Sequence, residues 1–166
     1  MPLNLLKQYN TLLDFGGFNP TQRRSSLKGV FNRDIANNPH FHFREKPINP
    51  TPKDGEIPME TLFTHLTTIT TDKQTKKREY DHDRSVRLHW IKHHIDEKKK
   101  NDMLIFSSKD KAGGRTYIYD RREFYVIVLE PLRKTDEYYL LTAYHLKGRD
   151  RFKIEKKYKR RLDELL

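Results

Sequence analysis

The sequence predicts an α+β fold: an N-terminal helix packed on a four-stranded antiparallel sheet with a C-terminal helix, preceded by an irregular N-terminal arm. Three observations predict it. Apolar residues recur at helical spacing after residue 81, four strand-like segments follow residue 103, and a helical period returns in residues 151–166. Because the links between the strands have hairpin length, an antiparallel sheet is expected and a Rossmann-like parallel sheet is not.

Residues 1–60 are expected to form the irregular arm, with one short helix in residues 1–14 that ends at Gly16-Gly17. Between residues 18 and 58, six prolines and many asparagines leave no helical or strand period. Residues 59–66 (METLFTHL) predict a short helix or turn, and the polar run after them predicts a loop. The organised domain should therefore cover residues 61–166.

The first long helix is predicted in residues 81–100, because Leu88, Ile91 and Ile95 are spaced i, i+3, i+7 on one face. Asp81 or Asp83 can cap its start, and the lysines that follow suit the negative end of its dipole.

The four predicted strands are the segments MLIFSS, RTYIYD, EFYVIVLE and EYYLLTAYHL. EFYVIVLE is apolar on both faces and should be the central strand. Period-two alternation places Tyr117 and Tyr119 on one face of their strand. The tail should form a helix whose buried side carries Ile154, Tyr158, Leu162 and Leu165 or Leu166.

Composition narrows the possible functions. The chain of 166 residues has a formal net charge of +11, and residues 61–166 carry 26 basic and 17 acidic residues. Such a charge favours a polyanionic partner, most often a nucleic acid. The absence of cysteine excludes disulfides, thiol catalysis and cysteine-based metal sites. No membrane span or secretory signal is evident, so a cytoplasmic protein is expected.

Common catalytic motifs are missing from the sequence. It contains no GxxxxGK[ST], GxGxxG, GxSxG or HExxH pattern, so NTP hydrolysis, dinucleotide binding and zincin chemistry have no support. The segment KDKAGG has the composition of a phosphate-binding loop, but a plain hairpin turn fits better because no helix follows it. No cofactor is expected.

The densest group of chemically capable side chains falls in the predicted first helix. It consists of His82, Arg84, Arg87, His89, His93 and His94. Histidine suits acid–base chemistry near neutral pH, and two arginines at i, i+3 can grip a phosphate. The simpler interpretation is that these residues form a solvated, basic surface of the helix. A zinc site from His89 and His93 has the right spacing but no third ligand, so no metal is expected.

A second group lies on the last predicted strand, where Thr142 and Tyr144 share one face and His145 points to the other. A pair of hydroxyl groups there can bind a phosphate or orient a catalytic histidine; an ordinary strand of good β formers is the alternative. The tyrosines of the sheet, including Tyr117 and Tyr119, offer stacking surface for unpaired bases unless they pack in the core.

The order of elements, with DRSVRLHWIKHHI, RTYIYDRREFYVIVLE and YYLLTAYHLKGR, resembles the barnase–EndoU–colicin–RelE superfamily of small ribonucleases, closest to its phage- and toxin-associated branch. The resemblance covers roughly residues 80–165. Some toxin members use a His–Arg–Thr–Tyr constellation, which implies catalytic roles for Thr142 and Tyr144. It leaves open the histidine (His89, or His93 or His94) and the arginine (Arg84, Arg87 or Arg115).

The resemblance implies a metal-independent endoribonuclease of phage or toxin type that leaves a 2′,3′-cyclic phosphate, with His89, Arg84, Arg87, Thr142 and Tyr144 as catalytic residues. RNA contacts are then expected from His93, His94, Arg115, Tyr117 and Tyr119. The partners would be RNA of the tRNA or mRNA class and a cognate inhibitor or immunity protein. Two alternatives remain: a nucleic-acid-binding module without catalysis, or an interaction protein whose residues 18–58 wrap a partner or a second copy.

Overall fold

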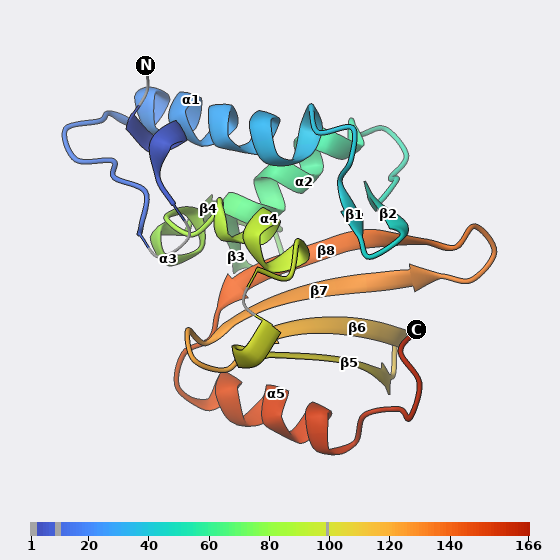
Figure 1. The fold of residues 1–166 in the computed structure, drawn as a ribbon. Coiled ribbons are helices and arrows are strands. Elements are labelled where there is room, and N and C mark those ends of the chain that lie inside the picture. Colours follow the sequence, from blue (N-terminus) through green and yellow to red (C-terminus); the bar gives the residue numbers. More distant parts are fainter. Residues whose placement is uncertain (1–2, 9–10, 99) are drawn as a thin grey trace.

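The computed structural model describes residues 3–8, 11–98 and 100–166 and shows an α+β protein built on a strongly curled, half-barrel sheet (Figure 1). The sheet order is β1-β2-β8-β7-β6-β5, and among these pairings β2–β8 is parallel. The strands of the sheet are β1 (His42–Phe43), β2 (Lys46–Pro50), β5 (Met103–Asp110), β6 (Gly113–Asp120), β7 (Tyr125–Leu132) and β8 (Glu137–His145). A separate antiparallel hairpin pairs β3 (Thr68–Asp72) with β4 (Lys77–Tyr80).

Helices cover both faces of the sheet. The α-helices are α1 (Pro20–Phe31), α2 (Pro58–Thr67), α3 (His82–Ser85), α4 (Trp90–Ile95) and α5 (Arg149–Lys159). Shorter helical turns are η1 (Leu3–Leu6), η2 (Asn32–Ala36) and η3 (Lys100–Asp102). α1, α2 and α4 lie on one side of the sheet and α5 lies on the other (Figure 1). Within the described residues, no helix is long and apolar enough to cross a membrane.

Side-chain alternation along β7 explains why the protein has two hydrophobic cores. Ile127 and Leu129 face the layer of α1, α2 and α4, whereas Val126 and Val128 face α5. All four side chains are buried, which confirms the prediction of a central strand that is apolar on both faces. The four predicted strands are confirmed as β5 to β8, and each pairs with its neighbour in antiparallel register. The prediction of a four-stranded antiparallel sheet is wrong, because β1 and β2 extend the sheet beyond β8 to six strands and β2 pairs with β8 in parallel.

The expectation of an irregular arm over residues 18–58 is wrong. Asn19 caps α1: its side chain accepts a hydrogen bond from the Gln22 backbone, and the Gln22 side chain accepts one from the Asn19 backbone. Pro20 occupies the first turn, where its missing N–H costs nothing. The buried apolar side chains of α1 lie only near its end. They are Leu27, Val30 and Phe31. The first half of the helix is polar, so the sequence shows no helical spacing of apolar residues there.

Two further segments expected to be irregular form strands. β2 joins the edge of the sheet with Ile48 opposite Tyr138, although it contains two prolines. Prolines are tolerated there because β2 is short and lies near the sheet edge. The polar run after residue 67 forms the β3–β4 hairpin, which its threonines favour.

The single long helix predicted in residues 81–100 is two short helices, α3 and α4, joined by turns. Bonds between residues three apart, such as Trp90 N–H to the Arg87 carbonyl at 2.9 Å, tighten the connection. Leu88, Ile91 and Ile95 are nevertheless all buried, as predicted. The helical spacing therefore predicted the buried side correctly, but it did not predict the break between α3 and α4.

The C-terminal helix is confirmed as α5, but it ends at Lys159, earlier than expected. Ile154 is buried and Tyr158 is half-buried on its inner side. The last residues run back along the sheet, where Leu162 N–H donates to the Ser107 carbonyl at 2.8 Å. The Tyr138 hydroxyl donates to the Leu166 carbonyl at 2.5 Å. The terminal leucines are thus placed by strand contacts rather than by a helix.

Candidate functional site

The site is located where the second half of β8 extends beyond its partner strand. Of β8, β2 pairs only with Tyr138 to Leu140, so no strand among the described residues covers the remainder of β8 on that side. A bulge at Leu141 shifts the register, after which Thr142 lies opposite Val128 and Tyr144 opposite Val126. This register confirms the prediction that Thr142 and Tyr144 share a face and that His145 points to the other.

A pocket of about 260 Å³ opens beside this part of β8. Its lining comes from the end of α2, the β3–β4 hairpin, the start of α3 and β8. The lining residues are His65, Ile69, Thr70, Arg78, Arg84 and Thr142. Tyr144 adjoins the pocket, because the Arg84 guanidinium carbon lies 5.6 Å from the centre of its ring. One imidazole, two guanidinium groups and several hydroxyl groups therefore meet in one place.

Arg78 is fixed by the hairpin that carries it. Its Nε donates to Thr68 Oγ1 at 2.8 Å, its Nη1 to Thr70 Oγ1 at 2.9 Å, and its Nη2 to the Thr68 carbonyl at 2.8 Å. These partners are all neutral, so the bonds orient the guanidinium without cancelling its charge. Partial burial lowers the pKa of Arg78 from its ordinary value, but an arginine remains charged under all ordinary conditions.

Arg84 is held at the start of α3, which Asp81 caps by accepting a bond from the Arg84 backbone at 3.0 Å. Its Nη1 donates to the carbonyls of His65 and Thr68 at 2.7 and 3.2 Å. Its Nε is buried and has no hydrogen-bond partner among the described residues. Arg84 thus connects α3 to the end of α2 and keeps unused donor capacity beside the pocket.

The environment moves the pKa values of His65 and Tyr144 in opposite directions. Burial lowers the pKa of His65 from its ordinary value, and the positive charges of Arg78 and Arg84 lower it further. Burial raises the pKa of Tyr144, an effect that Arg84 partly offsets. At neutral pH the imidazole is therefore neutral and can accept a proton, while the phenol retains one that it can donate.

This arrangement has the parts that phosphate ester chemistry requires. Arg78 and Arg84 can neutralise a phosphate and the charge that grows on it in a transition state. His65 and Tyr144 form an acid–base pair with separated pKa values, and Thr142 adds a hydroxyl donor. Among the described residues, no group of three or more His, Asp or Glu side chains is placed to hold a metal ion.

Of the five residues predicted to be catalytic, the structure brings together Arg84, Thr142 and Tyr144. It places His89 elsewhere. His89 is buried, and its Nε2 donates to the carbonyls of Gln8 and Thr11 at 2.9 and 2.8 Å. Burial lowers its pKa, and the ring does not line the pocket. His89 anchors the N-terminal segment against α4.

The other two histidines of the predicted cluster also lie away from the pocket. His94 is fully buried, with its ring nitrogens 2.7 Å from the Trp90 carbonyl and 2.9 Å from Asp120 Oδ2. His93 is half-buried and lines a second pocket together with His89. The Nε2 atom of His89 is bonded to two carbonyl groups and is therefore not a free ligand for a zinc ion.

The remaining candidates make their contacts outside the pocket. Arg87 donates to the Asp83 carbonyl at 2.7 Å and lies over the Trp90 ring. Arg115 pairs with Glu130 at 3.8 Å, two strands away from Thr142 in the sheet order. Tyr117 and Tyr119 share a face, as predicted, but both are buried beneath α5 and offer no surface for a base to stack on.

Sequence reasoning missed His65 and Arg78. His65 lies in a segment expected to be only a short helix or turn, and Arg78 lies in a run expected to be loop. A usable signal was present: residues 67–71 (TTITT) are all β-branched, which favours a strand soon after the α2 histidine and hence a hairpin that reaches Arg78. Their approach to Thr142 depends on tertiary structure and has no local signature.

Comparison of the chain with protein-family models, with curated proteins and with solved structures finds no match.

Proposed function

We propose that the protein is a metal-independent endoribonuclease whose active site is the pocket of His65, Arg78, Arg84 and Thr142, together with Tyr144. The observation that carries this proposal is the convergence of a neutral imidazole, two guanidinium groups and a hydroxyl group from four chain segments in one pocket. The net charge of +11 supports an RNA substrate.

The reaction begins with attack of a ribose 2′-oxygen on the adjacent phosphorus. His65 accepts the proton of the 2′-hydroxyl as the new P–O bond forms. The bond from phosphorus to the 5′-oxygen breaks, and Tyr144 donates its proton to that leaving oxygen. The products are a 2′,3′-cyclic phosphate and a 5′-hydroxyl, and solvent returns the proton from His65 to Tyr144.

The other pocket residues stabilise the transition state. Arg78 and Arg84 neutralise the charge that grows on the non-bridging oxygens, as fixed donors in a partly buried site do effectively. Thr142 donates a hydrogen bond that positions the phosphate. Because Arg78 is already oriented by Thr68 and Thr70, little reorganisation accompanies the reaction.

The direct test incubates the purified full-length protein with total RNA in EDTA and maps the ends of the fragments. Discrete fragments with 2′,3′-cyclic phosphate ends are expected from wild type and from His40→Ala, an exposed histidine outside the pocket. Thr142→Val and Tyr144→Phe should yield little product. RNA that stays intact with wild type, but shifts on a native gel, would overturn the nuclease and leave a nucleic-acid-binding module.

The proposal extends to a role as an effector in phage or inter-bacterial conflict, for which growth is the readout. Expression of wild type should arrest a bacterial host, and co-expression of a cognate inhibitor should relieve the arrest. A host that tolerates the protein at a level at which it degrades RNA in lysate would contradict this role.

A further inference from the structure

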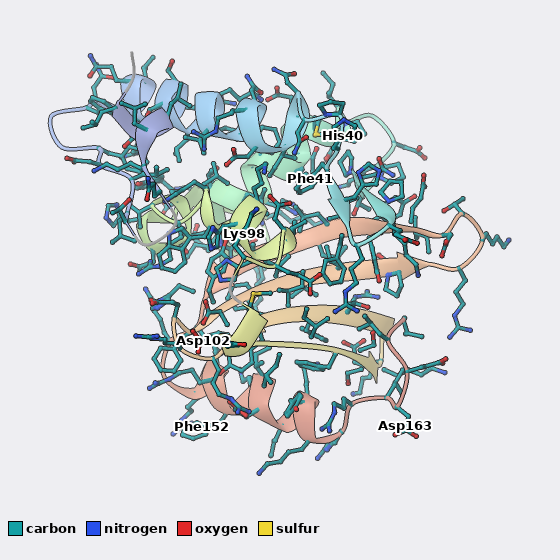
Figure 2. The ribbon with its side chains drawn as sticks, viewed as in Figure 1. His40, Phe41, Lys98, Asp102, Phe152 and Asp163 are labelled. Carbon is teal, nitrogen blue, oxygen red and sulfur yellow. The ribbon has the colours of Figure 1, made fainter. Side chains whose placement is uncertain are left out.

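The outer surface of α5 carries a stripe of cations around one exposed phenylalanine. The stripe, called here the α5 stripe, has spacings of three and four residues, and each of its members is exposed. It consists of Arg149, Phe152, Lys153, Lys156, Lys159 and Arg160. Phe152 is 72% exposed and points outward from the helix (Figure 2). A large apolar side chain in the middle of a basic surface suits a ligand that has both negative charges and an apolar or aromatic face.

Little of this charge is neutralised by the protein. Residues 147–161 contain nine basic and two acidic residues. Glu155 is engaged by Arg121 at 3.0 Å and by the Tyr119 hydroxyl at 3.2 Å, on the inner side of the helix. Asp150 pairs with Lys153 at 3.4 Å. Among the described residues, no ion pair joins Arg149, Lys156 or Lys159 to an acidic side chain.

The α5 stripe begins beside the proposed active site. α5 follows β8 after a three-residue link, and the charge of Asp150 acts on the Tyr144 hydroxyl. Lys147, in the link, forms an ion pair with Asp83 of the α3 helix that carries Arg84. With a rise of about 1.5 Å per residue, α5 leads away from the pocket for roughly 16 Å.

We infer that the α5 stripe binds the single-stranded part of an RNA substrate next to the cleaved bond, with its cations on phosphates and Phe152 stacked on a base. This inference rests on the proposed ribonuclease function and adds the form of the substrate. An unpaired base offers a face to an aromatic ring, whereas a duplex hides its bases in the stack. A membrane surface fits less well, because the apolar side of α5, with Ile154 and Tyr158, is already packed on the sheet.

The test measures binding without cleavage, by fluorescence anisotropy with a 2′-O-methyl RNA oligonucleotide whose blocked 2′-oxygens cannot attack. Lys153→Gln/Lys156→Gln should weaken binding and lower the slope of log Kd against log salt by about 1.4, as expected for two lost phosphate contacts on a single strand. Phe152→Ala should weaken binding roughly 5- to 150-fold, the range found for one lost stacking contact. The matched control is Arg133→Gln/Lys134→Gln, which changes two exposed cations in the β7–β8 turn.

Equal effects of the control and α5 variants would overturn the inference, as would absence of RNA binding by wild type. So would a Phe152→Ala protein that keeps its affinity for RNA but loses binding to anionic phosphatidylserine vesicles. A wild type that binds the oligonucleotide through α5 and leaves ordinary RNA intact would instead overturn the proposed function alone. A wild type that cleaves RNA with no dependence on the α5 stripe would overturn only the inference.

Discussion

At the scale of single residues, the proposed mechanism depends on His65 at the end of α2, whose pKa is lowered first by partial burial and then by the charges of two arginines. Removal of a proton-transfer group slows a reaction by about 100- to 10,000-fold. We therefore expect His65→Ala to lower the single-turnover rate of RNA cleavage by that factor and to leave the melting temperature nearly unchanged, since the side chain is exposed. An unaltered rate would remove His65 from the mechanism.

The pH dependence of cleavage follows from the same residue. A general base must be unprotonated, and the pKa of His65 lies below its ordinary value of 6.5. The rate should thus rise with pH along a limb whose midpoint lies below pH 6.5, then stay level because Tyr144 keeps its proton. Rates measured from pH 4.5 to 8.5 check this. The acidic limb should be missing from the residual activity of His65→Ala.

Protonation of His89 should make the stability of the protein, rather than its activity, depend on pH. Burial lowers its pKa in the folded state, so between that pKa and 6.5 the unfolded chain binds more protons. The free energy of unfolding should therefore fall as pH falls through this window, by up to about 1.4 kcal/mol per pH unit for one such group. His89→Gln should flatten the dependence in urea titrations at pH 7.5 and 5.5, whereas the exposed His40→Gln should not.

At the scale of elements, one buried carboxylate joins α4 to the sheet. Asp120, at the end of β6, contacts His94 Nε2 through Oδ2, and its Oδ1 accepts the backbone N–H groups of Arg122 and Glu123 at 3.0 Å each. Asp120→Ala would leave the buried His94 ring without that partner and remove two backbone hydrogen bonds, which should cost about 3 kcal/mol of unfolding free energy. Denaturant titration of the variant measures it, and a loss below 1 kcal/mol would contradict the account.

The elements also show what the sequence could predict. Strands β5 to β8 were predictable because alternation and apolar runs are local, and the shared face of Thr142 and Tyr144 followed from period two alone. Helix α1 was missed because the apolar side chains that it buries are confined to its end. The break after Ser85 was missed because Leu88 and Ile91 keep their helical spacing across it.

The candidate site was only partly predictable for a similar reason. Arg84, Thr142 and Tyr144 have local signals: a capped helix start and a strand of good β formers. The choice of histidine does not, since it depends on α2 and the hairpin folding against β8. His89 and His94 were stronger candidates for the catalytic histidine in the sequence. In the structure both are buried away from the pocket and held by carbonyl and carboxylate partners.

At the scale of the whole molecule, the N-terminal third is part of the fold. Leu13, Leu27, Val30 and Phe31 belong to the same hydrophobic core as Ile127 of the central strand. Each such buried side chain contributes roughly 1.5 to 3 kcal/mol. A chain that begins at residue 61 should therefore fail to fold, as circular dichroism and thermal melting can show. Limited proteolysis that releases a stable fragment from residue 61 onward would contradict this.

The same integration weakens the interpretation of residues 18–58 as a free arm that wraps a partner, because α1, β1 and β2 are packed against the rest of the chain. Basic side chains do gather at the pocket of Arg78 and Arg84 and along α5. In the proposed function, the pocket positions a phosphate and α5 binds the adjoining strand of the RNA.

In the proposed mechanism a ribose 2′-hydroxyl is the nucleophile, and a single pair of substrates can show whether that hydroxyl is required. Once a cleavage position is mapped, two RNA oligonucleotides are compared that differ only by a 2′-deoxyribose at that position. The account predicts that wild type cuts the all-ribose strand and leaves the substituted strand intact at that bond. Cleavage of both strands at the same rate, or of neither, would contradict it.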